Sequence, residues 1–175
     1  MSEKTVRLMH YDPRWRQEFL QTRSGVLQSC SGWVRQVEHI GSTAISGLVA
    51  RPIIDVLAGV HSDAEIENGI DQAAELVEGL NYRRVTAHRW AADCVVLDKP
   101  RHGEPTHRIY LMAIDCPAWR HAIGIRDMLR GKPEYAIRFE ETKIARWRAG
   151  QGDPDRYEAD KAVFFTHLID QIDAG

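Results

Sequence analysis

The chain has 175 residues, of which 43% are hydrophobic and 27% charged, and this composition excludes a disordered, collagen-like or disulfide-rich protein. The length predicts one domain with its own core, and no apolar run approaches the roughly 18 residues of a membrane span. A net charge of −2 disfavours a dedicated nucleic-acid-binding protein. Three cysteines without a C-x-x-C pair, and an N-terminus without an apolar leader, predict a cytoplasmic location.

The first half of the chain contains both helical and strand-like segments. Residues 13–29 carry apolar side chains at helical spacing, and residues 33–40 are predicted to be extended. Residues 41–47 form a loop of small residues. Residues 52–60, PIIDVLAGV, are apolar on both faces and are therefore predicted to form a buried central strand. A helix is predicted over residues 63–80.

The second half completes the sheet and then becomes helical. Its predicted strands are residues 82–86, 94–97 and 107–114. The Pro- and Gly-containing loop 98–105 is expected to pair the last two strands antiparallel. Its predicted helices run from residues 115 to 129, 134 to 148 and 154 to 172, and Asp115 is expected to cap the first of them.

This layout predicts an α+β fold, in which helices cover a mixed or antiparallel sheet of about five strands. We expect a single domain over residues 1–175. Its sheet-containing part extends to about residue 114, and a helical section follows from about residue 115 to residue 175.

A carboxylate interrupts the apolar central strand. Burying Asp55 is costly unless a metal ion, a cation or several donors compensate its charge. The preceding Gly-Ser-Thr turn, residues 41–43, could hold a phosphate, because glycine lets backbone amides approach it and the hydroxyls add donors. His39 could orient this turn as a neutral imidazole or contact an anion as a cation. A purely structural interpretation, with Asp55 paired to Arg51 or another cation, is equally open.

Cations stand at apolar positions of the predicted late helices. Arg126 and Lys161 lie within apolar stripes, and Lys143 follows one aromatic residue and precedes another by four positions. Each side chain could simply extend its charge to the helix edge. Taken with a buried carboxylate, they instead indicate an anion-binding pocket. We therefore expect Ser42, Asp55, Arg126 and Lys161 to line one pocket.

Well-known catalytic motifs are missing from the sequence. It has no H-E-x-x-H zinc helix, no G-x-S-x-G elbow, no Walker A loop and no G-x-G-x-x-G fingerprint. The eight histidines also form no H-x-x-x-H pair.

Several segments, in order along almost the whole chain, resemble the GrpB-like family. They are HYDPRWRQEF, EHIGSTAISGLVARPIIDV, THRIYLMAIDCPAWRHAIGIRDMLRGKPE and a closing Y-x-x-x-K-x-x-F formed by Tyr157, Lys161 and Phe164. The resemblance implies a DNA polymerase β-like nucleotidyltransferase fold. In that superfamily a Gly-Ser turn holds nucleotide phosphates, and acidic residues on neighbouring strands hold divalent metals that align the attacking oxygen.

Carried over by position, Gly41 and Ser42 match the turn and Asp55 matches the first carboxylate, which makes it the candidate catalytic residue and a ligand for Mg²⁺ or Mn²⁺. The chain departs from the pattern elsewhere. Leu57 occupies the second acidic position and cannot bind a metal. Arg108 and Tyr110 stand where the family often has histidine, and their strand contains no acidic residue.

Two functions remain open from the sequence. The first is an enzyme of the transferase type that acts on a nucleotide or another phosphorylated small molecule. The second is a non-catalytic module with a degenerate metal site that binds an anionic metabolite or a protein partner. In both, the candidate ligand-binding residues are His39, Gly41, Ser42, Thr43, Arg51, Arg108, Tyr110, Arg126, Lys143, Tyr157 and Lys161. Neither interpretation includes a nucleic acid or a membrane as partner.

Overall fold

The computed structural model describes residues 5–61, 66–88, 94–153 and 168–174. The helices and strands, in chain order, are α1 (Arg14–Ser29), β1 (Val34–Ile40), the short 3-10 helix η1 (Ser42–Ala44), β2 (Ile54–Val60), α2 (Ile66–Glu78), β3 (Arg83–Arg84), β4 (Val95–Lys99), β5 (His107–Ala113), α3 (Pro117–Gly131) and α4 (Pro133–Ala149). Residues 168–173 are also helical. The predicted last helix therefore lies partly outside the described residues.

The five strands form one mixed sheet in the order β1-β2-β5-β4-β3. β2 pairs antiparallel with β1 and parallel with β5, and β4 pairs antiparallel with both β5 and β3. β2 is therefore an interior strand, and all but one of its residues are buried, which is why its sequence is apolar on both faces. This arrangement confirms the predicted α+β class.

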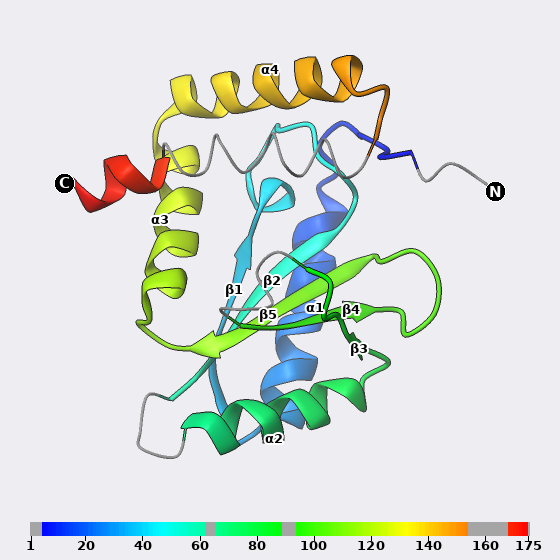
Figure 1. Ribbon diagram of the computed structural model, residues 1–175, viewed down its shortest axis with the longest axis vertical. Helices are drawn as coiled ribbons and strands as arrows, with labels where there is room; N and C mark the ends of the chain where they lie inside the picture. The colour runs from blue at the N-terminus through cyan, green and yellow to red at the C-terminus, as the bar shows by residue number, and fades with distance from the viewer. Residues whose placement is uncertain (1–4, 62–65, 89–93, 154–167, 175) are drawn as a thin grey trace.

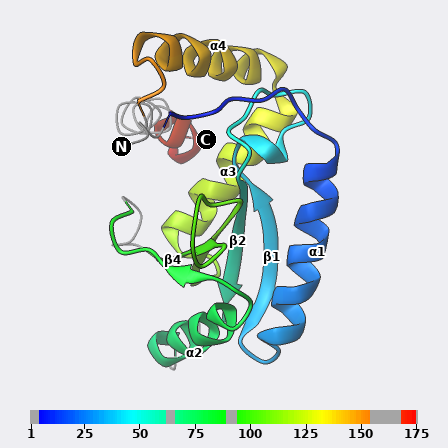
Figure 2. The ribbon, with the colours of Figure 1, turned by 90° about the vertical axis from the view of Figure 1, so that its right-hand side faces the viewer.

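Helices cover both faces of the sheet. α1 and α2 contact one face, and α3 contacts the other at β1 and β2 (Figure 1). The largest apolar cluster lies under α1 and α2 and includes Val56, Ile109 and Leu111. On the opposite face, Trp119 of α3 packs against Leu57 and Met112. Figure 2 shows α1 and α3 on either side of β1 and β2, with α4 beyond the end of the sheet.

A third apolar cluster joins the helical section to the segment after β1. Phe139 of α4 and Leu129 of α3 pack against Ile45, Leu48 and the C-terminal Leu168. The helical section is thereby fixed to the loop that connects β1 to β2, so residues distant in sequence meet beside the sheet.

The start of α3 differs from the prediction by one residue. Asp115 does not cap the helix, because it adopts a left-handed backbone conformation with φ of 64° that turns the chain before the helix begins. The N-cap is Cys116, whose Sγ accepts a hydrogen bond from the Trp119 amide at 3.4 Å. Pro117 then occupies the first helical turn, where its missing amide hydrogen costs nothing.

Two further segments differ in extent. The predicted loop 41–47 contains the short helix η1, and the strand predicted over 82–86 is reduced to Arg83–Arg84 in β3. Across the described parts of the chain, every helix is too short or too polar to cross a bilayer.

Candidate functional site

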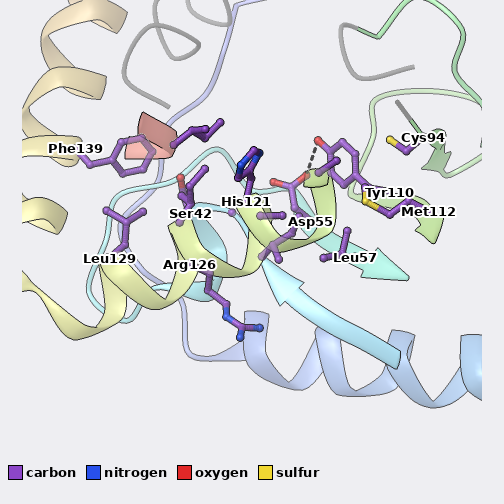
Figure 3. Close-up of a pocket in the computed structure, with 16 residues that line it drawn as sticks. Ser42, Asp55, Leu57, Cys94, Tyr110, Met112, His121, Arg126, Leu129 and Phe139 are labelled. Carbon is purple, nitrogen blue, oxygen red and sulfur yellow. Dashed lines mark hydrogen bonds between the residues drawn. The ribbon is translucent and has the colours of Figure 1, made fainter. Parts of the chain in front are cut away.

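A cavity of about 120 Å³, here called the Asp55 cavity, lies where the α3 face of the sheet meets the turn after β1 and the helical section (Figure 3). Asp55 and Tyr110 reach it from β2 and β5, and Ser42 reaches it from the turn. α3 contributes His121 and Arg126. The rest of the wall is mainly apolar, so the cavity is suited to a ligand with both a polar and an apolar part.

Asp55 lies close to the turn because residue 41 is glycine. Gly41 has φ of 72°, a left-handed conformation that residues with side chains rarely adopt. A Cβ atom at this position would lie only 2.6 Å from Asp55 Oδ2. On its other oxygen, Asp55 accepts a long hydrogen bond from the Tyr110 hydroxyl at 3.5 Å. The carboxylate is thus held between the turn and β5.

Arg108 is on the same sheet face as Asp55 but binds another carboxylate. Its Nε donates to Asp98 Oδ1 at 2.6 Å and its Nη2 donates to Asp98 Oδ2 at 2.9 Å. Burial acts to lower the pKa of Arg108, but these hydrogen bonds and the nearby Asp55 charge outweigh it, so the pKa lies above its ordinary value. Predicted as a ligand-binding residue, Arg108 is not among the described residues that line the cavity.

Lys143 reaches the turn from α4. Its ammonium group donates to Ser42 Oγ at 2.6 Å and to the Val49 carbonyl at 2.7 Å, and it lies 4.5 Å from the centre of the Phe139 ring. Only 4% of Lys143 is exposed. Of the two predicted helix cations within the described residues, Arg126 and Lys143, it is therefore Lys143 whose charge lies on the Gly-Ser turn.

Arg126 lines the Asp55 cavity, but its charge points elsewhere. Figure 3 shows the guanidinium directed away from Asp55. It donates to Glu38 Oε2 at 2.6 Å and to Asp127 Oδ1 at 2.8 Å. The stem of Arg126 thus occupies the apolar stripe while its charge extends to the edge of the helix, which was the alternative interpretation.

The expected cluster is therefore only partly assembled. Ser42, Asp55 and Arg126 line one cavity as expected. Lys161 and Tyr157 lie outside the described residues. Arg51 precedes β2 and is not among the described residues that line the Asp55 cavity.

His39 and Thr43 lie on the other side of the turn. His39 Nε2 is 2.9 Å from Thr43 Oγ1, and its ring stacks on Phe19 with 4.7 Å between ring centres. Both residues line a second cavity, together with Arg16 and Arg130. Burial, helped by Arg130 and Arg126, lowers the pKa of His39 to about 4. His39 is therefore neutral near pH 7 and orients the turn, which was one of its two expected roles.

His121 is a site residue that the sequence reasoning missed. It lines the Asp55 cavity, and its Nε2 lies 3.0 Å from Asp173 Oδ1 near the C-terminus. Its position four residues before Ile125 and eight before Leu129, which also line the cavity, was the available signal. His121 belongs to no histidine motif, so residue type alone does not mark it as a site residue.

The donors around Asp55 do not fit the metal pair that the fold family implies. Among the described residues, no group of three or more acidic, histidine or cysteine side chains could hold a metal ion. Leu57 is apolar and fully buried, and Arg108 brings a positive charge to the neighbouring strand. Divalent cations such as Mg²⁺ need several oxygen ligands, and the described residues around Asp55 do not supply the second and third carboxylates of such a pair.

Comparison with known proteins gives one family and one fold class. The family model described as "GrpB protein" matches residues 5–171. The glutamate-rich protein GrpB of Alkalihalophilus pseudofirmus is 23% identical, and the match covers 95% of both chains. A UPF0157 protein of Streptomyces coelicolor is 29% identical over 90% of this chain and 78% of its own length.

Solved structures extend the comparison. The crystal structure of conserved protein GrpB from Enterococcus faecalis has a TM-score of 0.78 at 25% identity and covers 95% of this chain and 99% of its own. The Cid1 poly(U) polymerase with Mg 3'-dATP bound has a TM-score of 0.50 at 10% identity, and the match covers 77% of this chain and 41% of that one. The latter similarity concerns the fold alone.

Proposed function

Because the chain belongs to the GrpB family and has a nucleotidyltransferase-like fold, we propose that it binds a nucleotide or another phosphorylated small molecule in the Asp55 cavity. The observation that carries the proposal is the buried Lys143 ammonium on the hydroxyl of Ser42. A buried cation beside a glycine-serine turn is chemically suited to a phosphate, since it supplies charge where hydroxyl and amide donors are also near.

The two ends of the cavity suit the two ends of such a ligand. At the turn, Ser42 would hold the phosphate. Lys143 is not among the described residues that line the cavity, so its charge would act from behind Ser42, through the hydrogen bond to that hydroxyl. At the strand end, the carboxylate of Asp55 and the hydroxyl of Tyr110 would accept or donate hydrogen bonds to a sugar or alcohol hydroxyl. The apolar wall between them, which includes Leu57 and Met112, would pack against the uncharged body of the ligand.

The residues beside Asp55 favour ligand binding over group transfer as the function of the site. Transfer by the two-metal route needs carboxylates where this chain has Leu57 and Arg108. In the fold neighbours, nucleotides are bound together with Mg, as 3'-dATP and as GTP in Cid1. We propose a cytoplasmic module that retains a phosphate site and in which Asp55 positions the ligand.

The test is thermal-shift titration of the full chain with nucleoside mono-, di- and triphosphates and with pyrophosphate. A ligand at 100 times its Kd stabilises the folded chain by about 2.7 kcal/mol, which is a readily measured shift. We expect Lys143→Met to weaken binding by at least about tenfold, the effect of roughly 1.4 kcal/mol of lost interaction. Lys132→Met, which removes an exposed lysine between α3 and α4, is the matched control and should bind as wild type does.

Two results would contradict the proposal. One is that none of these compounds shifts the unfolding temperature of the wild-type chain. The other is that Lys143→Met and Lys132→Met lose the same small amount of affinity, because the buried ammonium would then have no special role. The variant Asp55→Asn tests the Asp55 end of the cavity independently of the phosphate end. It should weaken the binding of nucleotides and leave the binding of pyrophosphate unchanged.

A further inference from the structure

Three charged residues stand side by side on the sheet face that carries the site. Arg108 of β5 is in register with Asp55 of β2 on one side and with Asp98 of β4 on the other. Registered neighbours in a sheet project their side chains to the same face, so the three form one row. The row places a single cation between two carboxylates, on the same strands that carry the candidate site.

Arg108 is fixed in this row. It makes two hydrogen bonds to Asp98, and its side chain is 13% exposed while that of Asp98 is 4% exposed. A bidentate guanidinium–carboxylate pair is strong and geometrically specific, and breaking a buried pair leaves an uncompensated charge. Arg108 therefore cannot move aside easily for a metal ion.

The order of the charges in the row decides what Asp55 meets. Arg108 lies between the two carboxylates, so the positive end of the Arg108–Asp98 pair is the end next to Asp55. A metal ion beside Asp55 would have to approach the guanidinium, and on its other side it would meet the apolar Leu57 instead of a second carboxylate. Coulomb repulsion and the lack of oxygen ligands both oppose it.

We propose that Arg108 is a built-in cation that takes the place of a divalent metal beside Asp55, so that the site binds its phosphorylated ligand without Mg²⁺ or Mn²⁺. The inference rests on the proposed function for the ligand but concerns this row of residues. Arg108 does not line the cavity, so it acts as a positioning residue. It offsets the negative charge that would otherwise repel the phosphate, and through Asp98 it is held in register with Asp55.

The experiment has two independent parts. In the first, Mn²⁺ alone is titrated into the full-length chain and free Mn²⁺ is measured by electron paramagnetic resonance, with Asp55→Asn as reference. In the second, AMP, which binds Mg²⁺ only weakly itself, is titrated by calorimetry in EDTA and again in excess Mg²⁺. Both parts are repeated with Asp98→Asn/Arg108→Met, a double variant chosen because removing both partners avoids a buried unpaired charge. Asp71→Asn/Arg84→Met removes an exposed ion pair on α2 and β3 and is the matched control.

We expect wild type and the control to take up no Mn²⁺ at Asp55 and to bind AMP equally in EDTA and in Mg²⁺. The double variant should bind AMP about tenfold more weakly in EDTA, corresponding to roughly 1.4 kcal/mol. Mg²⁺ should restore part of that loss, because an external cation then does what Arg108 did. A purely structural ion pair would weaken AMP binding without creating any response to Mg²⁺.

The inference is overturned if wild type takes up Mn²⁺ and Asp55→Asn does not, or if wild-type AMP binding requires Mg²⁺. It is also overturned if the double variant shows no response to Mg²⁺. If AMP binds under no condition, the proposed function loses its support for nucleoside monophosphates, whereas the Mn²⁺ titration still decides whether the Asp55 row excludes a metal.

Discussion

His39 makes the stability of the chain depend on pH. Its pKa is about 4 in the folded chain and 6.5 as the ordinary value, because the ring is buried against Phe19 and lies near two arginines. Between these values the unfolded chain binds the proton and the folded chain does not. The contribution of neutral His39 to the free energy of unfolding is therefore fully present above about pH 6.5 and decreases as the pH falls toward 4.

This difference predicts a loss of about 3 kcal/mol in the free energy of unfolding from pH 6.5 to 4, measured by urea unfolding at a series of pH values. The variant His39→Gln should have a smaller slope over this range, even if it is less stable at neutral pH. His102→Gln is the control, because the His102 side chain is exposed and should leave the slope as in wild type. An identical slope in His39→Gln would show that other groups cause the pH dependence.

Gly41 is a second residue on which the site depends, through its backbone conformation and its missing side chain. An alanine there would be strained by its positive φ and would collide with the Asp55 carboxylate. We expect Gly41→Ala to weaken nucleotide binding by at least about tenfold, roughly 1.4 kcal/mol, as measured by calorimetry. Gly103→Ala, also at positive φ but with open space around it, should be destabilised by strain alone and should retain the wild-type affinity. Equal losses of affinity in the two variants would contradict a role of the Gly41–Asp55 contact.

At the scale of elements, α3 approaches β2 closely because residue 59 is glycine. A Cβ atom there would lie 2.5 Å from Ile114 Cγ1 and 2.7 Å from Trp119 Cζ3. Gly59→Ala should therefore destabilise the chain by about 1–3 kcal/mol, the usual cost of overpacking. Gly25→Ala in α1 meets no atom within 4 Å and should instead stabilise it by about 0.5–1 kcal/mol. Chemical denaturation of both variants checks the opposite signs.

The elements themselves could largely be predicted from the sequence, because they depend on local patterns. The apolar run before Val60 and the helical stripes of α1, α3 and α4 are visible in the printed residues. The start of α3 was misplaced because both Asp115 and Cys116 can cap a helix, and the backbone conformation that decides between them does not follow from residue type.

The candidate site was harder to predict because it depends on the direction of long side chains. Periodicity placed Arg126, and less clearly Lys143, on an apolar stripe, yet Arg126 extends to Glu38 at the helix edge and Lys143 reaches Ser42. Which occurs depends on the acceptors that the fold brings within reach. The pairing of Arg108 with Asp98 likewise depends on the register of β4 and β5, which the loop between them fixes only approximately.

The whole molecule combines two packing regions that should differ in stability. The main cluster lies between the sheet and α1 and α2, whereas a smaller cluster joins α3, α4 and Leu168 to the loop after β1. Small clusters with few buried apolar contacts open more readily than the rest of a domain.

Leu168→Ala, which truncates a fully buried side chain, should cost about 2–5 kcal/mol locally. Amide hydrogen exchange should then show faster exchange in α4 while β2 and β5 keep their protection. Val77→Ala in the main cluster is the matched control and should accelerate exchange in the sheet as well. Because Lys143 and Phe139 belong to α4, an opening of this section would also release the ammonium from Ser42, so Leu168→Ala should weaken nucleotide binding more than Val77→Ala does. Equal effects of the two variants on exchange and on binding would mean that the chain opens as one unit.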